Sequence, residues 1–188
     1  MPFRGGTLIG RNHGEFGGGL WWVARDGGRG TQLSDENVHW FVETSFGMVA
    51  LTGIDHMNVS QGQAVLVAAS GPLPPSISVL ADLQGAPRVF VLDEAGNILV
   101  MTATQLIRIS ERGSETLFTT DYGLTGPTSI VKEPSGTVYV GMRHFITRLT
   151  PTGQSFEEDW LVPADCPRFR RESGLRDVDC KCLGGAPS

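Results

Sequence analysis

Residues 87–113 read PRVFVLDEAGNILVMTATQLIRISERG, and residues 127–153 read PTSIVKEPSGTVYVGMRHFITRLTPTG. A shift of 40 positions superimposes the two stretches without a gap. Six aligned positions are identical: Pro87/Pro127, Val91/Val131, Gly96/Gly136, Val100/Val140, Arg108/Arg148 and Gly113/Gly153. Repetition at a fixed period near 40 residues is typical of solenoids and propellers. The sequence therefore predicts a repeat protein with two closely similar units.

Each copy has the pattern of four short strands separated by turn residues. The runs are expected at residues 87–92, 97–102, 106–109 and 115–119 in the first copy, and at 127–131, 137–142, 145–149 and 156–162 in the second. An acidic residue and a glycine follow the first run, which is the chemistry of a hairpin turn. The apolar spacing near 3.6 that helical repeats need is absent. Four antiparallel strands per unit predict an all-β chain that forms a β-propeller or partial propeller.

The second copy also carries a recognisable motif. Residues 123–136 read GLTGPTSIVKEPSG, followed directly by TVYVG and, after a gap, by ITRL. This pattern resembles the blade repeat of two-component-regulator, NHL and streptogramin-lyase-like propellers, in which an acidic residue and a glycine precede a strand with an aromatic position. The resemblance covers two blades well and implies a blade fold. It says almost nothing about activity, because this fold hosts lyases, hydrolases, sensors and binding modules.

The composition fits one domain with many turns. The chain has 188 residues, of which 40% are apolar, and it contains 25 glycines and 11 prolines. No apolar run approaches the roughly 20 residues that cross a bilayer, and the first residues contain no signal segment. We therefore expect no membrane partner and a cytoplasmic location by default, unless the chain is a piece of an exported protein. The net charge of -5 gives no support to nucleic acid as a partner.

The first blade is predicted to be incomplete. Residues 5–10 align with residues 136–141, so the chain enters this blade at its second strand, and residues 20–23 supply the third. No inner strand is expected before Thr7, so either upstream residues of a longer protein supply that strand or two copies of the chain associate through this blade. The connection at residues 11–19 reads RNHGEFGGG, far richer in glycine than its counterparts. Such a loop permits close approach of the backbone to a ligand or another chain.

A second, diverged blade is expected at residues 38–70, which brings the count to about four blades of four strands. Its strands are predicted at residues 38–42, 48–52, 57–60 and 64–68. Prolines in residues 71–75 interrupt any strand, because proline removes a backbone donor. Residues 77–83 either extend the outer edge of this blade or lead into the next. The propeller-like domain is predicted to span residues 1–162.

Residues 163–188 show neither pattern and are predicted to form an irregular tail. This tail holds the three cysteines of the chain: Cys166, Cys180 and Cys182. They are compatible with incidental thiols, with one disulfide and a free thiol, or with a three-thiolate metal site completed from elsewhere. The paired spacing of four ligands that marks a zinc site is missing.

The candidate binding residues are expected in the loops between second and third strands. They are His13, Glu15 and Phe16 in the glycine-rich loop, Asp55 and His56 in the second blade, and His144 in the fourth. Equivalent loops of a propeller emerge on one face, so these side chains are predicted to converge there. Histidines with carboxylates serve as acid–base groups or hold a divalent cation. Turns also collect Asp and His for backbone reasons, and a structural or merely exposed role is favoured for these residues over a functional one.

Two classes of function remain. The common hydrolase and nucleotide signatures are absent, and we assign no catalytic residue and no cofactor. The favoured function is a non-enzymatic binding propeller that presents a loop face to a protein or peptide, as in a sensor, adaptor or toxin-neutralising module. The alternative is a metal-assisted lyase or hydrolase of the streptogramin-lyase-like kind. That resemblance would imply Mg²⁺ held by His and Glu, but its motif positions do not match this chain residue by residue.

Overall fold

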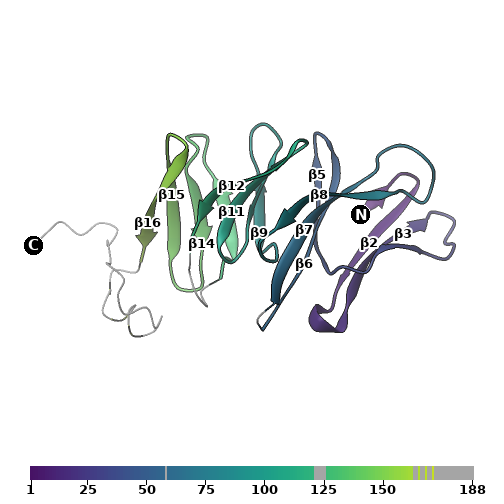
Figure 1. Cartoon of the computed structure of the whole chain (residues 1–188), viewed down its shortest axis with the longest axis horizontal. Coiled ribbons are helices and arrows are strands. Elements are labelled where there is room, and N and C mark those ends of the chain that lie inside the picture. The colour runs from purple at the N-terminus through teal and green to yellow at the C-terminus, as the bar shows by residue number, and fades with distance from the viewer. Residues whose placement is uncertain (58, 121–125, 163–164, 166–167, 169–170, 172–188) are drawn as a thin grey trace, which may run out of the picture.

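The computed structural model describes residues 1–57, 59–120 and 126–162, together with residues 165, 168 and 171. These residues form four antiparallel sheets of four strands each, side by side along one axis (Figure 1). Sheet 1 contains β1 (Pro2–Phe3), β2 (Gly6–Asn12), β3 (Gly18–Ala24) and β4 (Thr31–Ser34). Sheet 2 contains β5 (Val38–Thr44), β6 (Gly47–His56), β7 (Val59–Val67) and β8 (Ile77–Leu83). Sheet 3 contains β9 (Val89–Leu92), β10 (Ile98–Met101), β11 (Gln105–Ser110) and β12 (Gly113–Thr119). Sheet 4 contains β13 (Ser129–Lys132), β14 (Val138–Gly141), β15 (Ile146–Thr152) and β16 (Ser155–Leu161).

The strands of every sheet are paired in sequence order, as in a propeller blade. This confirms the predicted all-β class with four blades, and it confirms the resemblance to propeller repeats at the level of the blade. Sheets 1 and 4 lie at opposite ends of the long axis in Figure 1. Among the described residues the four sheets therefore form an open row, which is a partial propeller.

Sheets 3 and 4 are the two copies of the sequence repeat. Val100 of β10 pairs with Phe90, and Val140 of β14 pairs with Ile130, so the two valines occupy equivalent positions. The hairpin glycines are equivalent too, because Gly96 and Gly136 have φ of 78° and 92°. These left-handed values are open to glycine without steric cost. The predicted turns of both hairpins are confirmed.

Sheet 1 differs from the prediction at its inner edge. A strand of two residues, β1, precedes Thr7 and pairs with the start of β2, so the first sheet has four strands. The expectation that no inner strand precedes Thr7 was wrong, because so short a strand leaves no periodic pattern in the sequence. The truncation itself is real, since the inner strands of sheets 3 and 4 each have four residues.

Sheet 2 differs from the prediction in its outer half. The sequence predicts two strands at residues 57–60 and 64–68, but Val59–Val67 is one continuous strand, β7. The fourth strand is β8, for which the sequence allows two assignments. The misleading signal is Gly62, which suggests a break. A Cβ at Gly62 would press on the carbonyl oxygens of Gly85 and Thr52, so the glycine reflects close packing within a strand.

The core consists of three apolar layers, one between each pair of neighbouring sheets. The first layer includes Leu8, Leu20 and Trp22 of sheet 1 and Val38, Met48, Ala50, Val65 and Val67 of sheet 2. The second lies between sheets 2 and 3, and the third between sheets 3 and 4. Burying one Val, Leu or Ile side chain contributes roughly 1.5–3 kcal/mol. The stacking of sheets therefore holds the row together and fixes the loops at its two long edges.

The two adjacent tryptophans show how the layers are organised. Trp22 is buried in the first layer, and its indole Nε1–H donates to the carbonyl of Phe3 at 3.2 Å. Trp21 points to the other face of sheet 1, as alternation along a strand requires. Within the described residues, no helix combines the length and the apolar character needed to cross a membrane.

Candidate binding surface

The candidate surface lies where two loops extend from the same edge of the row. One is the β2–β3 loop, which contains a short 3₁₀ helix, η1 (Gly14–Phe16). The other is the tip of the β6–β7 hairpin, whose strands are the two longest of the described strands, with 10 and 9 residues. Helix η1 contacts β6, and both tips lie at the lower edge in Figure 1. The structure thus brings together loops from sheets 1 and 2.

A short contact between a carboxylate and a histidine, which is an ion pair when the histidine is protonated, joins the two tips. Glu15 Oε2 of η1 lies 2.9 Å from His56 Nδ1 at the end of β6. Both side chains are partly exposed, so the pair adds little to stability, about 0–1 kcal/mol. These two residues were predicted to converge, and the structure places them in direct contact. His56 and Asp55 lie within β6, however, and not in the loop where they were expected.

A buried asparagine holds the glycine-rich loop in place. Asn37, in the connection between sheets 1 and 2, accepts a hydrogen bond from the backbone N–H of His13 at 3.1 Å. Its amide Nδ2 donates to the carbonyl of Gly14 at 2.9 Å. Both polar ends of a buried side chain are therefore satisfied by one loop, which fixes its path. Sequence reasoning missed Asn37, because an Asn after Asp35 and Glu36 reads as ordinary turn chemistry.

The glycines of the loop have conformational reasons of their own. Gly14 and Gly17 have backbone φ angles of 58° and 90°, which residues with a side chain rarely adopt. A Cβ at Gly18 would overlap Asn37, and a Cβ at Gly19 would overlap the ring of Trp21. The density of glycine thus builds the shape of the loop. It follows that the side chains of the loop, not its glycines, carry any binding role.

Three apolar side chains are exposed around the ion pair. Phe16 is 85% exposed, Met57 is 91% exposed, and Val59 is half exposed. We call Phe16, Met57 and Val59 the tip patch. Phe16 follows Glu15 in the chain and Met57 follows His56, so each of the two largest members is next in sequence to one residue of the pair. Of these three, only Phe16 was among the predicted binding residues; Met57 was assigned to a strand.

Polar groups behind the tip patch connect sheets 1, 2 and 3. Asp55 forms an ion pair with Arg88, which precedes β9. His39, the extra residue at a β-bulge in β5, places its Nε2 3.0 Å from the Gly53 carbonyl oxygen and 3.3 Å from Asn12 Nδ2. Burial lowers the pKa of His39, the Gly53 hydrogen bond opposes this, and nearby Arg88 lowers it further. Sequence reasoning did not find His39, which lies in the middle of a predicted strand.

The remaining predicted residues do not join this group. His13 is exposed, and its Nε2 lies 3.4 Å from Arg11 Nη2. His144 lies in the β14–β15 connection of sheet 4, at the other end of the row from sheet 1 (Figure 1). Across the described part of the chain, no three His, Cys, Asp or Glu side chains come together as a metal site would require. Cys166, Cys180 and Cys182, the other proposed metal ligands, fall outside the described residues.

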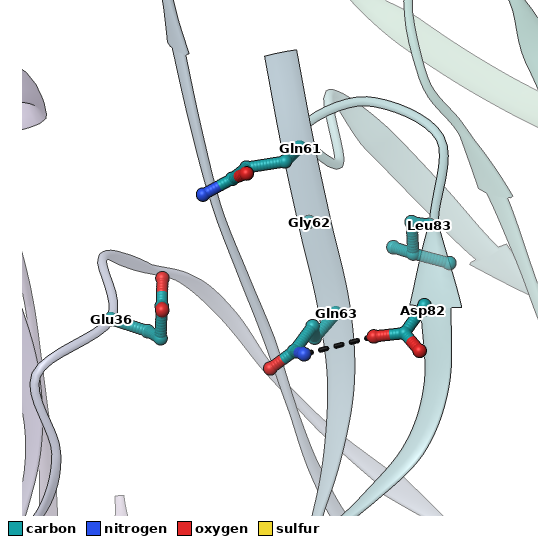
Figure 2. Close-up of a pocket in the computed structure, with 6 residues that line it drawn as sticks. All are labelled: Glu36, Gln61, Gly62, Gln63, Asp82 and Leu83. Carbon is teal, nitrogen blue, oxygen red and sulfur yellow. Dashed lines mark hydrogen bonds between the residues drawn. The ribbon is translucent and has the colours of Figure 1, made fainter. Parts of the chain in front are cut away.

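A separate pocket lies between the β4–β5 connection and the outer strands of sheet 2. It has a volume of about 230 Å³ and is lined by Glu36, Gln61, Gly62, Gln63, Asp82 and Leu83. Figure 2 shows Glu36 across the pocket from Gln63, whose Nε2 donates to Asp82 Oδ1 at 2.9 Å. Four of these six residues, Glu36, Gln61, Gln63 and Asp82, have side chains with hydrogen-bond acceptors. The pocket suits a small donor-rich group, and it is smaller than the roughly 300–1,000 Å³ of most ligand sites.

No protein-family model and no curated protein matches the sequence. Several solved structures resemble its fold. One is an extracellular domain described as part of a one-component system from B. thetaiotaomicron. The alignment covers 85% of this chain and 28% of that domain's chain, at 11% identity and TM-score 0.45. A calcium-binding protein, regucalcin, from Agrobacterium tumefaciens aligns over 84% and 60%, at 14% identity and TM-score 0.45. A gluconolactonase from Xanthomonas campestris aligns over 66% and 41%, at 11% identity and TM-score 0.42. The chain thus spans less than two thirds of each of these proteins, and the likenesses say nothing of what it binds.

Proposed function

We propose that this chain is a binding module that captures a protein or peptide at the tip patch, with sheets 1 to 4 as a rigid scaffold. The observation that carries the proposal is the exposure of Phe16 and Met57 at adjacent tips that the Glu15–His56 ion pair holds together. Large apolar side chains grouped at a surface and flanked by charges are the usual anchors of protein interfaces. A peptide groove or a partner loop would bury both side chains at once.

The backbone at Met57 supports the same function. Met57 has φ of 51°, in the left-handed region that turns usually fill with glycine or asparagine. A methionine there costs on the order of 1 kcal/mol or more. Its side chain is almost fully exposed, so no packing in the chain itself offsets that cost. Flexible methionines adapt to varied partner surfaces, which gives this residue a reason to occupy the tip.

The charged groups around the tip patch support a partner that has both apolar and charged side chains. Glu15 and Asp55 contribute acidic groups, and Arg88, which is paired with Asp55, contributes a basic one. Such a polar rim adds hydrogen bonds and orientation around an apolar centre. The separate placement of His144, in sheet 4, favours binding over metal-assisted catalysis, because an acid–base or metal site needs its side chains within mutual reach.

The test is selection of peptides from a random 12-residue display library on the purified chain, followed by titration of the selected peptides. We expect Phe16→Ser and Met57→Gly to weaken binding at least tenfold each, because each removes an apolar anchor. Met57→Gly should also keep or slightly raise the melting temperature, since glycine relieves the backbone.

The matched control is Leu73→Ser, which removes another apolar side chain, 52% exposed, from the β7–β8 connection at the other end of β7. It should leave binding unchanged. Peptides that bind all three variants equally well would refute the tip patch as the binding site, and so would a library that yields no specific peptide.

A further inference from the structure

Sheet 4 has one face that points away from sheet 3. The equivalent face of sheet 3 is covered by sheet 4. In sheet 3 this face consists of apolar residues that pack against sheet 4, namely Val89, Leu99, Met101 and Leu106. The 40-residue shift assigns to the same positions in sheet 4 the residues Ser129, Tyr139, Gly141 and Ile146. These residues alternate with Val138, Val140 and Leu149, which face sheet 3, so they point away from it. Within the described residues, the repeat thus leaves one stacking position at this end of the row without a further sheet.

This outward face of sheet 4 keeps part of the apolar character of a stacking face. Val131 is 56% exposed and Ile146 is 45% exposed. Arg148 of β15 and Asp159 of β16 lie opposite each other on the two outer strands of this sheet. Arg148 Nη2 donates to Asp159 Oδ2 at 2.6 Å, which forms an ion pair between these strands. Another sheet packed on this face would therefore contact apolar side chains and two charged side chains, Arg148 and Asp159, that already neutralise each other.

The outward face of sheet 1 has a complementary make-up. Its inner face carries Leu8, Leu20 and Trp22 in the core, so the alternate residues Ile9 and Trp21 face outward. Ile9 is 43% exposed, and Trp21 lies over Gly19 with the Arg11 guanidinium 5.7 Å from its ring centroid. This end of the row thus presents an apolar strip with one cation, whose charge is opposite to that of the exposed Glu157 on β16.

We propose that two copies of this chain close a ring of eight sheets, with sheet 4 of each copy packed on sheet 1 of the other. This goes beyond peptide binding at the tip patch, which stays free because stacking buries sheet faces and not loop tips. Sheets 1 to 4 stack in one direction along the row, so sheet 4 against sheet 1 of a second copy continues the order already present. Such a head-to-tail contact used twice is closed and symmetric. Eight blades lie within the usual range for propellers, about 4–8.

The first measurement is the mass of the full chain by light scattering and sedimentation equilibrium at rising concentration. We expect a species of about 40 kDa, twice the 20.2 kDa of one chain, with no larger forms. Ile146→Asp and Ile9→Lys should each convert the protein to a monomer, because each places a charge in an apolar contact. The control Val79→Asp alters a comparably exposed residue of sheet 2, away from both end faces, and should leave the dimer intact.

The two monomeric variants also test the head-to-tail arrangement. In a mixed dimer, one contact joins the two substituted faces, where the introduced carboxylate and ammonium groups attract each other, and the second contact is unaltered. Mixing Ile146→Asp with Ile9→Lys should therefore restore a dimer with twice the 20.2 kDa mass of one chain. Circular dichroism and denaturation of each variant must match the parent, so that loss of the dimer is not loss of the fold.

Four outcomes would overturn the proposal. The first is a parent chain that stays monomeric at all concentrations, which would leave the end faces for other sheets or partners. The second is a dimer that survives both substitutions. The third is a dimer broken by only one of them, which would indicate a contact between like faces. The fourth is growth into open polymers, which would show the contact without ring closure.

Discussion

The half of the molecule made of sheets 3 and 4 repeats itself at a shift of 40 residues, whereas the half made of sheets 1 and 2 keeps the blade topology with different strand lengths. The second strands of sheets 3 and 4, β10 and β14, have four residues each, but β6 in sheet 2 has ten. The extra length carries the hairpin tip beyond the layer of stacked sheets. The comparison teaches that the repeat builds the scaffold and that departures from it build the candidate surface.

The largest effect is expected from the regular half. Leu106 is fully buried between sheets 3 and 4, so Leu106→Ala should lower the free energy of unfolding by about 2–5 kcal/mol. Met57→Ala in the divergent half should lower it by less than about 0.5 kcal/mol, because that side chain packs on nothing it would leave empty. Urea denaturation of both variants measures the contrast. Similar losses at the two sites would show that the tip is part of the core.

An intermediate effect is expected at the link between the two loops of the candidate surface. Asn37→Ala removes two hydrogen bonds to the glycine-rich loop and should cost about 1–3 kcal/mol. Hydrogen exchange of the His13 amide should become faster, because one of its two acceptors is lost and only the Gly17 carbonyl, at 3.0 Å, remains. Asn97→Ala is the control: it removes a side-chain hydrogen bond to Asp93 in the regular half and should leave exchange at His13 unchanged. Unaltered exchange in Asn37→Ala would mean that the loop does not depend on Asn37.

The smallest effect is expected from the pH dependence of sheet 2. Burial lowers the pKa of His39, so the folded chain binds a proton there less readily than the unfolded chain does. The contribution of neutral His39 to stability is therefore present above pH 6.5, its ordinary value, and is lost as the pH falls toward its folded pKa. Denaturation between about pH 5 and pH 8 should show this loss in the parent chain. If His39→Gln loses as much stability over the same range, His39 is not the group responsible.

The regular half could be predicted closely from sequence, and the physical reason is duplication. Val100 and Val140, or Gly96 and Gly136, support each other's assignment because a chance pattern would not recur at the same offset. No such second copy exists for sheets 1 and 2. There, Gly62 suggests a break although it marks close packing, and the two-residue β1 is too short for any pattern to reveal.

The candidate surface was predictable only in part. Glu15 and His56 are both predicted as loop-face residues, and they do meet. His144 is predicted to join them but lies in sheet 4, because a fold-level rule about faces gives no distances within a face. Asn37 and His39 matter because their side chains form hydrogen bonds between segments that are distant in the sequence. Met57 matters because its side chain is exposed. Neither property follows from residue type, because both depend on which segments pack together.

The position of Asn37 has a consequence for the kinetics of binding. Its side chain bonds the β2–β3 loop, and its backbone carbonyl accepts the N–H of Gly53 in β6 at 2.8 Å. Both segments are thereby bonded to one residue. If the tip patch binds a partner as proposed, the two loops are held by the same side chain and backbone before the encounter. The backbone of the two loops would then need little ordering on binding, and only side chains such as Met57 would still have to adopt one conformation. Association should then proceed at the ordinary rate for rigid surfaces, and differences between partners should appear mainly in how long each stays bound.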